Sequence, residues 1–134
     1  MPRRRPLLTT ALMLAPSLGL AQTRRTIRLI VPFSAGGNTD ALARIVSPRV
    51  GELLDAIIAV ENRPSASAVV GVEAVVRAPA DGNTLLISDT TLPVMPVLNA
   101  NLPFDIFRDL QTVAAIASAP TTLVVRAGLP APDL

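Results

Sequence analysis

The sequence predicts an α/β fold, a parallel sheet with helices on both faces. Short apolar runs rich in β-branched residues, at 27–31, 57–60 and 84–87, indicate buried strands. Between them lie segments with helical spacing of apolar residues, at 39–54 and 69–77. The order β-α-β-α-β is typical of parallel strands joined by crossover helices. With 134 residues, the chain is long enough for one domain with its own core.

Composition excludes several kinds of site. The chain contains no cysteine, histidine or lysine, which excludes disulfides, cysteine- or histidine-ligated metal, a Ser-His-Asp triad and a Walker A lysine. The remaining candidates for catalysis are carboxylates, hydroxyls and arginines, and the sequence does not arrange them as a pair, so no catalytic residues and no metal ligands are expected. Residues 22–134 carry nine arginines against ten acidic residues, a net charge of −1, and only 2% of the whole chain is aromatic. A nucleic-acid partner is not expected.

The first 21 residues have the pattern of a cleavable secretory signal peptide. Three consecutive arginines at 3–5 precede an apolar stretch at 7–20, and Ala21 ends a small-x-small cleavage motif. The apolar stretch is short for a membrane span, although an uncleaved anchor is the alternative. The arginines leave Sec and twin-arginine export both open. We expect a periplasmic protein whose mature part is 22–134.

The stretch 26–40 organises the rest of the chain. After the strand at 27–31, Pro32 and the Gly36–Gly37 pair end the extended pattern, and a helix is expected from about residue 39. Adjacent glycines allow a close approach of backbone to a ligand, and a helix start offers unpaired N–H groups and partial positive charge. Such a loop suits an anion, in particular a carboxylate. The alternative is an ordinary turn without a ligand.

The remaining elements follow from similar signals. Pro48 predicts a kink or break in the first helix near Ser47. Ser67 is a candidate cap for the second helix. A short or broken helix is expected around 94–99, one helical turn at 106–110, further strands at 113–116 and 121–126, a turn at 128–132, and the start of a helix at 133–134.

Ligands of parallel sheets bind beyond the carboxyl ends of the strands, where the strand order reverses. The loops at 33–39 and 88–92 both follow predicted strands, so we expect them to form two lips of one site. Hydroxyl groups that add possible donors are those of Ser34, Thr39, Thr90 and Thr91. Ordinary turn and cap chemistry is the alternative role for each of them.

Four separated motifs resemble one family. They are IRLIVPFSAGGNTDALAR at 27–44, VENRP at 60–64, GVEAVVRAPADGNTLLIS at 71–88 and LPFD at 102–105. Their order resembles the periplasmic solute-binding proteins of tripartite tricarboxylate transporters, the Bug/TctC family. The resemblance implies a two-lobe α/β protein without metal or cofactor. It also implies binding of a small organic acid and its delivery to membrane transporter subunits or a sensor.

In that family the glycine loop contacts the ligand carboxylate through backbone groups and nearby water. Asp40 alternatively acts only as a first-turn acid that stabilises its helix. Where the family has a proline in this loop, the chain has Ala35, and a glycine-rich stretch after the Asn-Arg-Pro motif is replaced by small residues at 65–68. The expected ligand-binding residues are Phe33, Ser34, Ala35, Gly36, Gly37, Asn38, Thr39, Asp40, Thr90 and Thr91.

The resemblance ends at Leu134, so 22–134 is expected to be an incomplete solute-binding domain with its second lobe largely missing. Such a lobe should expose apolar surface, and binding by it alone is expected to be millimolar or weaker. One alternative is a truncated relative with a regulatory role or no ligand. A nucleotide-using α/β enzyme is another, against which stands the sequence Gly-Gly-x-x-Asp in place of Gly-x-Gly-x-x-Gly.

Overall fold

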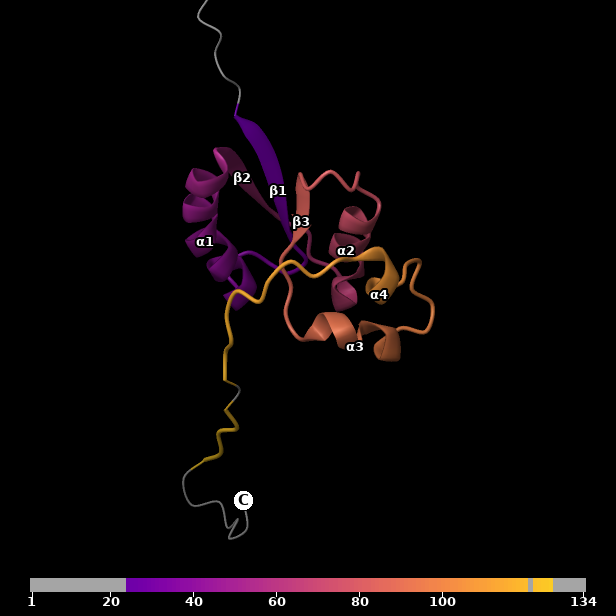
Figure 1. Ribbon diagram of the computed structural model, residues 1–134. Coiled ribbons are helices and arrows are strands. Elements are labelled where there is room, and N and C mark those ends of the chain that lie inside the picture. Colours follow the sequence, from indigo (N-terminus) through magenta and orange to yellow (C-terminus); the bar gives the residue numbers. More distant parts are fainter. Residues whose placement is uncertain (1–23, 121, 127–134) are drawn as a thin grey trace, which may run out of the picture.

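The computed structural model describes residues 24–120 and 122–126 (Figure 1). Its centre is a parallel sheet of three strands in the order β2-β1-β3. These strands are β1 (Arg25–Val31), β2 (Ala56–Asn62) and β3 (Thr84–Leu86). The predicted parallel α/β fold is therefore confirmed. The predicted signal peptide lies outside the described residues.

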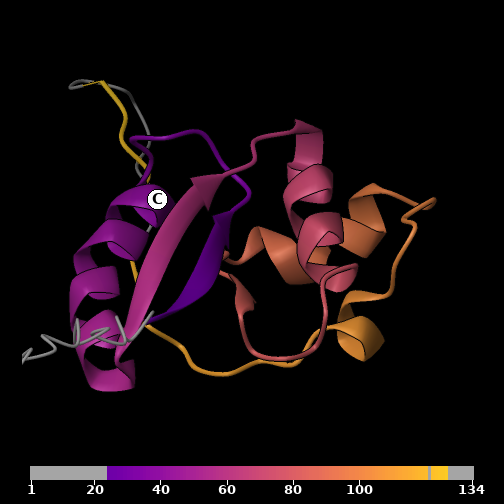
Figure 2. The ribbon, with the colours of Figure 1, turned by 90° about the horizontal axis from the view of Figure 1, so that it is seen from above.

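β1 occupies the middle of the sheet because its apolar residues serve both faces. Leu29 and Val31 are buried in a cluster on one face, while Ile27 and Ile30 are also fully buried. Helix α1 (Asn38–Leu54) covers one face, and helix α2 (Val69–Val76) covers the other (Figure 2). The first connection runs from β1 to β2 on one side of β1, and the second runs from β2 back past β1 to β3 on its other side. The strand order thus reverses at the carboxyl end of β1.

Helix α1 approaches the sheet through small residues. Its buried positions Ala43, Ser47 and Gly51 recur at helical spacing and let the helix backbone lie close to the strands. Two larger apolar residues of this helix, Ile45 and Leu53, are mostly exposed. The helical spacing of apolar residues therefore located the helix, while smaller residues make its contact with the sheet.

Of the kink or break predicted near Ser47, the break is wrong, because α1 continues through Pro48. Proline removes one helical hydrogen bond, a cost of about 3 kcal/mol, which packing against the sheet compensates here. The hydroxyl of Ser47 donates to the carbonyl oxygen of Ala43 at 2.6 Å, which satisfies that buried hydroxyl within the helix. Packing of α1 against the sheet therefore outweighs the helix-breaking tendency of Pro48.

The loop after β2 differs from the prediction in its cap. A short 3-10 turn (Ala66–Ala68) leads into α2, and Ser67 makes no cap hydrogen bond. Instead, the hydroxyl oxygen of Ser65 accepts a bond from the amide of Val70 at 3.0 Å. Ser67 and Ala68 have φ angles of 56° and 61°, in the left-handed region that favours glycine. The resemblance implied glycines in this stretch, and a left-handed backbone at 67 and 68 is a conformation that glycine adopts without strain.

Two helices complete the described part. They are α3 (Thr91–Leu98), which is longer than expected and continuous through Pro96, and α4 (Ile106–Asp109), the predicted single turn. The predicted strands at 113–116 and 121–126 are not formed in 111–120 and 122–126, which run exposed and without a neighbouring strand. A strand needs a partner to satisfy its backbone groups, and here none lies alongside. The turn and the helix start predicted for 128–134 fall outside the described residues.

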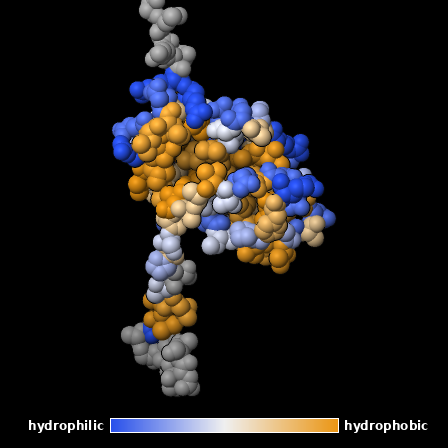
Figure 3. Space-filling view, in the orientation of Figure 1, coloured by the Kyte–Doolittle hydropathy of each residue, from blue (hydrophilic) through white to orange (hydrophobic). Residues whose placement is uncertain are grey.

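Apolar residues are concentrated on the surface as well as in the core. Figure 3 shows hydrophobic residues over much of the face seen in Figure 1. Large side chains that are more than two-thirds exposed include Val97 and Phe107 on α3 and α4. The core contains two clusters, one on each face of the sheet, and Phe33 packs against both. The expectation that the chain exposes apolar surface is thus confirmed.

Candidate functional site

The two predicted site loops follow neighbouring strands. The amide of Ile87 donates to the carbonyl oxygen of Ile30 at 3.0 Å, which keeps the ends of β3 and β1 side by side. Beyond this bond, Phe33 of the first loop and Leu92 of α3 pack against the same core cluster. The loops at 32–37 and 88–90 therefore leave the same edge of the sheet, where its strand order reverses (Figure 1).

The first loop turns sharply at its glycines. Gly36 has a φ of 86°, a conformation that residues with a side chain rarely adopt. Gly37 caps α1 with an extended backbone, and a Cβ atom added there would lie 3.5 Å from the carbonyl oxygen of Ser34, an ordinary contact. The fold thus requires glycine at 36 but not at 37. The missing side chain at Gly37 leaves room in front of the helix.

The beginning of α1 is open to solvent. No side chain among the described residues caps this helix, and residues 34–38 are exposed. The first backbone N–H groups of a helix have no partner within it and carry partial positive charge. In a helix of 17 residues, such a start is suited to binding an anion.

Asp40 is buried beneath this loop and holds it in place. Its Oδ2 atom accepts bonds from the amide of Gly36 at 2.9 Å and from Nε of Arg44 at 3.1 Å. Its Oδ1 atom accepts a bond from Nδ2 of Asn62 at 2.9 Å. The hydrogen bond from Arg44, followed by those from Gly36 and Asn62, lowers the pKa of Asp40 to about 2. Both carboxylate oxygens are thus occupied by internal partners.

Asn62 is the residue of this site that sequence reasoning missed. Besides Asp40, its Nδ2 group donates to the carbonyl oxygen of Phe33 at 3.2 Å, and its Oδ1 atom accepts from Nη2 of Arg44 at 3.1 Å. Asn62 lies in the VENRP motif at 60–64, which was used for the family resemblance and not for the site. Hydrogen bonding between separate elements was not apparent from that motif.

The second loop offers fewer free hydrogen-bond donors than expected from the sequence. Thr91 is engaged with Asp89, to which it donates from its amide at 2.9 Å and from its hydroxyl at 2.6 Å. Thr90 is exposed and its side chain makes no cap bond. The Oγ atom of Ser88 is buried without a hydrogen-bond partner in the described part of the chain. Asp89 adds an exposed negative charge to this lip.

The ten predicted residues therefore divide by position. The exposed ones are Ser34, Ala35, Gly36, Gly37, Asn38, Thr90 and Thr91. Phe33 and Thr39 are half-buried, and Asp40 is buried. The structure brings all of them to one edge of the sheet but turns the Asp40 carboxylate inward.

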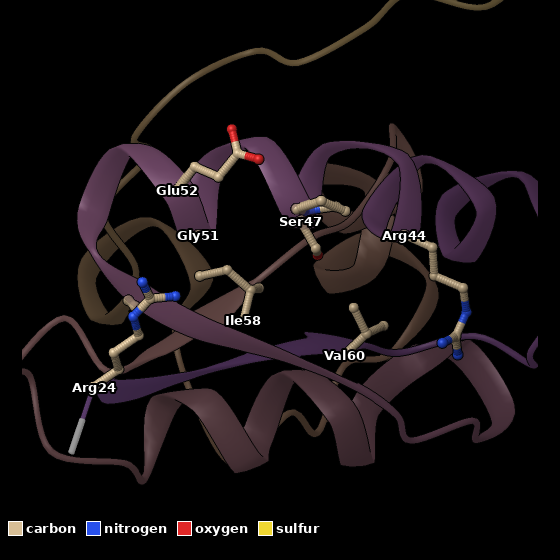
Figure 4. A pocket seen from close by; sticks show the side chains of 9 residues that line it. Arg24, Arg44, Ser47, Gly51, Glu52, Ile58 and Val60 are labelled. Atoms are coloured by element: carbon tan, nitrogen blue, oxygen red, sulfur yellow. The ribbon is translucent and has the colours of Figure 1, made fainter. Parts of the chain in front are cut away.

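A groove of about 450 Å³ lies elsewhere, between α1 and β2 (Figure 4). Ile58 and Val60 form part of its wall, and the side chains of Arg24 and Arg44 lie toward its two ends. Both arginines are already paired with acidic residues, Asp55 and Asp40 respectively. The predicted loops do not line this groove.

Within residues 24–120 and 122–126, acidic side chains do not gather in a group of three that would suit a metal ion. In the same part of the chain, no helix combines the length and the apolar character that a membrane span requires.

Comparisons with known proteins agree with this fold. A UPF0065 protein of Bordetella pertussis is 43% identical over 133 residues, covering 97% of this chain and 41% of that protein. Protein BugT of the same organism is 34% identical, covering 87% and 36%. A solved structure described as a periplasmic transporter is 39% identical, with a TM-score of 0.58 over 63% of this chain and 29% of that one.

The chain spans about two-fifths of the length of these curated relatives. The family model described as "Tripartite tricarboxylate transporter family receptor" (TctC) matches residues 42–134, well over half of the chain. The chain therefore belongs to the TctC family of tripartite tricarboxylate transporter receptors.

Proposed function

We propose that this chain provides the carboxylate-binding loop of a periplasmic solute receptor for a tripartite tricarboxylate-type uptake system. The observation that supports this most strongly is the exposed, uncapped start of α1 at the strand-order reversal. Family membership adds the ligand class, since these receptors are named for tricarboxylate transport. The role is binding without catalysis, metal or cofactor.

In the proposed complex, a ligand carboxylate lies in front of Gly37 and accepts bonds from the amides of Gly37, Asn38 and Thr39. The helix dipole favours the negative charge, and the missing side chain at Gly37 admits it. The amide of Gly36 takes no part because it donates to Asp40. Thr90, on the neighbouring loop, offers a hydroxyl for a second polar group of the ligand.

Location and partners follow from the same proposal. A cleaved leader at 1–21 would export the protein to the periplasm. There the receptor would deliver its ligand to membrane transporter subunits or to a sensor. A truncated relative without a ligand is the alternative, and binding measurements distinguish the two.

Binding by this chain alone is expected to be weak. Charge-assisted hydrogen bonds contribute about 1.5–3 kcal/mol each, and association costs at least roughly 4 kcal/mol. Two or three such bonds leave an affinity that is millimolar or weaker. The exposure of residues 34–38 is in keeping with this expectation, because a ligand held there would stay largely in contact with water.

The test is titration of residues 22–134 with succinate, citrate and malonate, followed by amide chemical shifts. We expect saturable shifts at 36–39 that are lost in Gly37→Ala, whose backbone angles and surroundings accept a methyl group. The melting temperature of this variant should stay near that of the parent. Absence of binding to every acid would favour the alternative, and binding of a nucleotide instead would favour an enzyme.

A further inference from the structure

The side-chain amide of Asn62 joins the end of β2 to both ends of the glycine loop. It donates to the carbonyl oxygen of Phe33, at the start of the loop, and to Asp40, just after it. It also accepts a bond from Arg44. Both donor hydrogens and the acceptor oxygen of this one side chain are therefore used.

Asn62 and its partner Asp40 each hold one backbone group of the loop. With the Phe33 carbonyl held by Asn62 and the Gly36 amide held by Asp40, two peptide groups of the loop are turned inward. The amides that follow, at the exposed start of α1, remain available to solvent. A loop held this way loses less conformational entropy when a ligand binds than a loop that must first be ordered.

We infer that Asn62 is a positioning residue for carboxylate binding, acting through Asp40 and the Phe33 carbonyl without touching the ligand. This inference rests on the proposed function. It differs from a role in strand pairing, because the Asn62 side chain bonds to the loop and to α1, whereas β2 pairs with β1 through backbone groups. Asn62 should therefore influence affinity more than it influences folding.

Two variants separate these roles. Asn62→Asp keeps the size of the side chain but removes both donors and places a second carboxylate beside Asp40. Asn62→Ala removes the side chain without adding charge. The matched control is Asn101→Ala, an exposed asparagine outside the site.

The measurements are the succinate dissociation constant from amide shifts, the melting temperature, and the pKa of Asp40 from its carboxyl carbon resonance in ligand-free protein. In Asn62→Ala we expect affinity about tenfold weaker, the equivalent of one ordinary hydrogen bond. The pKa of Asp40 should rise, because one donor to its charged form is lost. Asn62→Asp should show both effects more strongly, and Asn101→Ala neither.

Two results would overturn the inference, and they are distinguishable. If the parent chain binds succinate and Asn62→Ala binds it equally well, the positioning role fails and the proposed function stands. If the parent chain binds none of succinate, citrate and malonate, the proposed function fails and the positioning role fails with it; if it binds citrate or malonate instead of succinate, the same comparison of variants is made with that acid. If one Asn62 variant does not fold, the other decides the matter.

Discussion

Gly71 of α2 packs directly against Pro32 at the start of the glycine loop. A Cβ atom at Gly71 would lie 2.6 Å from the Cβ and 2.8 Å from the Cα of Pro32, and 3.1 Å from the carbonyl oxygen of Arg63. These distances are too short for a side chain, and two of the three neighbouring atoms belong to the backbone. Helix α2 therefore supports the loop from the face of the sheet opposite to α1.

Gly71→Ala should consequently destabilise the fold and displace the loop. The added methyl group must push α2 away from Pro32, and overpacking of this kind typically costs about 1–3 kcal/mol. Chemical denaturation measures the loss, and amide shifts of Gly36 and Gly37 report the displacement. Val70→Ala, at an exposed position of the same helix, is the control and should change little. Wild-type stability in Gly71→Ala would show that α2 can shift freely.

Acid should destabilise the chain partly through Asp40. The pKa of Asp40 is lowered from 3.8 to about 2 in the folded state by its bonds with Arg44, Gly36 and Asn62. Below pH 4 the unfolded chain therefore binds more protons than the folded one, and the contribution of Asp40 is lost as the pH falls from about 4 to 2. It is fully present above that range. Urea denaturation between pH 2 and 6 measures this slope.

The matched variant for the acid experiment is Asp40→Asn. We expect it to be less stable than the parent at pH 6, with a flatter decline toward pH 2, because position 40 no longer titrates. Equal slopes in the two proteins would mean that other carboxylates account for the acid sensitivity.

Ser67→Gly should stabilise the chain. Ser67 has a φ of 56°, and this left-handed conformation costs residues with a side chain roughly 1–2 kcal/mol. Glycine avoids this cost, but its greater conformational freedom in the unfolded state offsets part of the gain in stability. A net gain of about 1 kcal/mol is expected in thermal or urea unfolding. Ser65→Gly should do the opposite, because it removes the oxygen that accepts from Val70. Destabilisation by Ser67→Gly would contradict the assigned backbone conformation.

Asp89 should distinguish between classes of ligand. In Asp89→Asn the side-chain oxygen still accepts from Thr91, while the negative charge at the second lip is removed. A dicarboxylate such as succinate should then bind about two- to threefold more tightly at low salt, because a like charge is gone. An amino acid with its ammonium group near Asp89 should bind more weakly instead. Equal changes in the affinities for succinate and aspartate in Asp89→Asn would mean that Asp89 lies away from the ligand.

Local patterns predicted much of the fold. The strand at 27–31 is continuously apolar, so its burial and the glycine turn after it could be recognised directly. The break expected at Pro48 is not formed, because packing of α1 against the sheet compensates for the helical hydrogen bond that proline removes. The strands expected at 113–116 and 121–126 are not formed in the described residues for a related reason, since a residue of high β-propensity forms a strand only beside a partner strand.

In the candidate site, too, features with a local signal were predictable, and features that depend on contacts between distant residues were not. The exposed glycine loop was recognisable because Gly-Gly before helix-starting residues is a local signal. Asn62 was not, because its role depends on hydrogen bonds to Phe33 and Asp40, which are distant in sequence. The inward orientation of Asp40 was likewise invisible, since a first-turn acid commonly faces solvent.

The central position of β1 also has a consequence for the order of folding. Thr26 pairs with Ile57, and Arg28 pairs with Thr84, so β1 is made before both of its neighbours and obtains them only after long stretches of chain have followed. Each pairing requires closure of a large loop before any sheet contact forms, which slows the rate-limiting step. A nascent chain that ends before Thr84 would leave one whole side of β1 unpaired. The complete set of neighbours of β1 is therefore available only after Leu86 has been made.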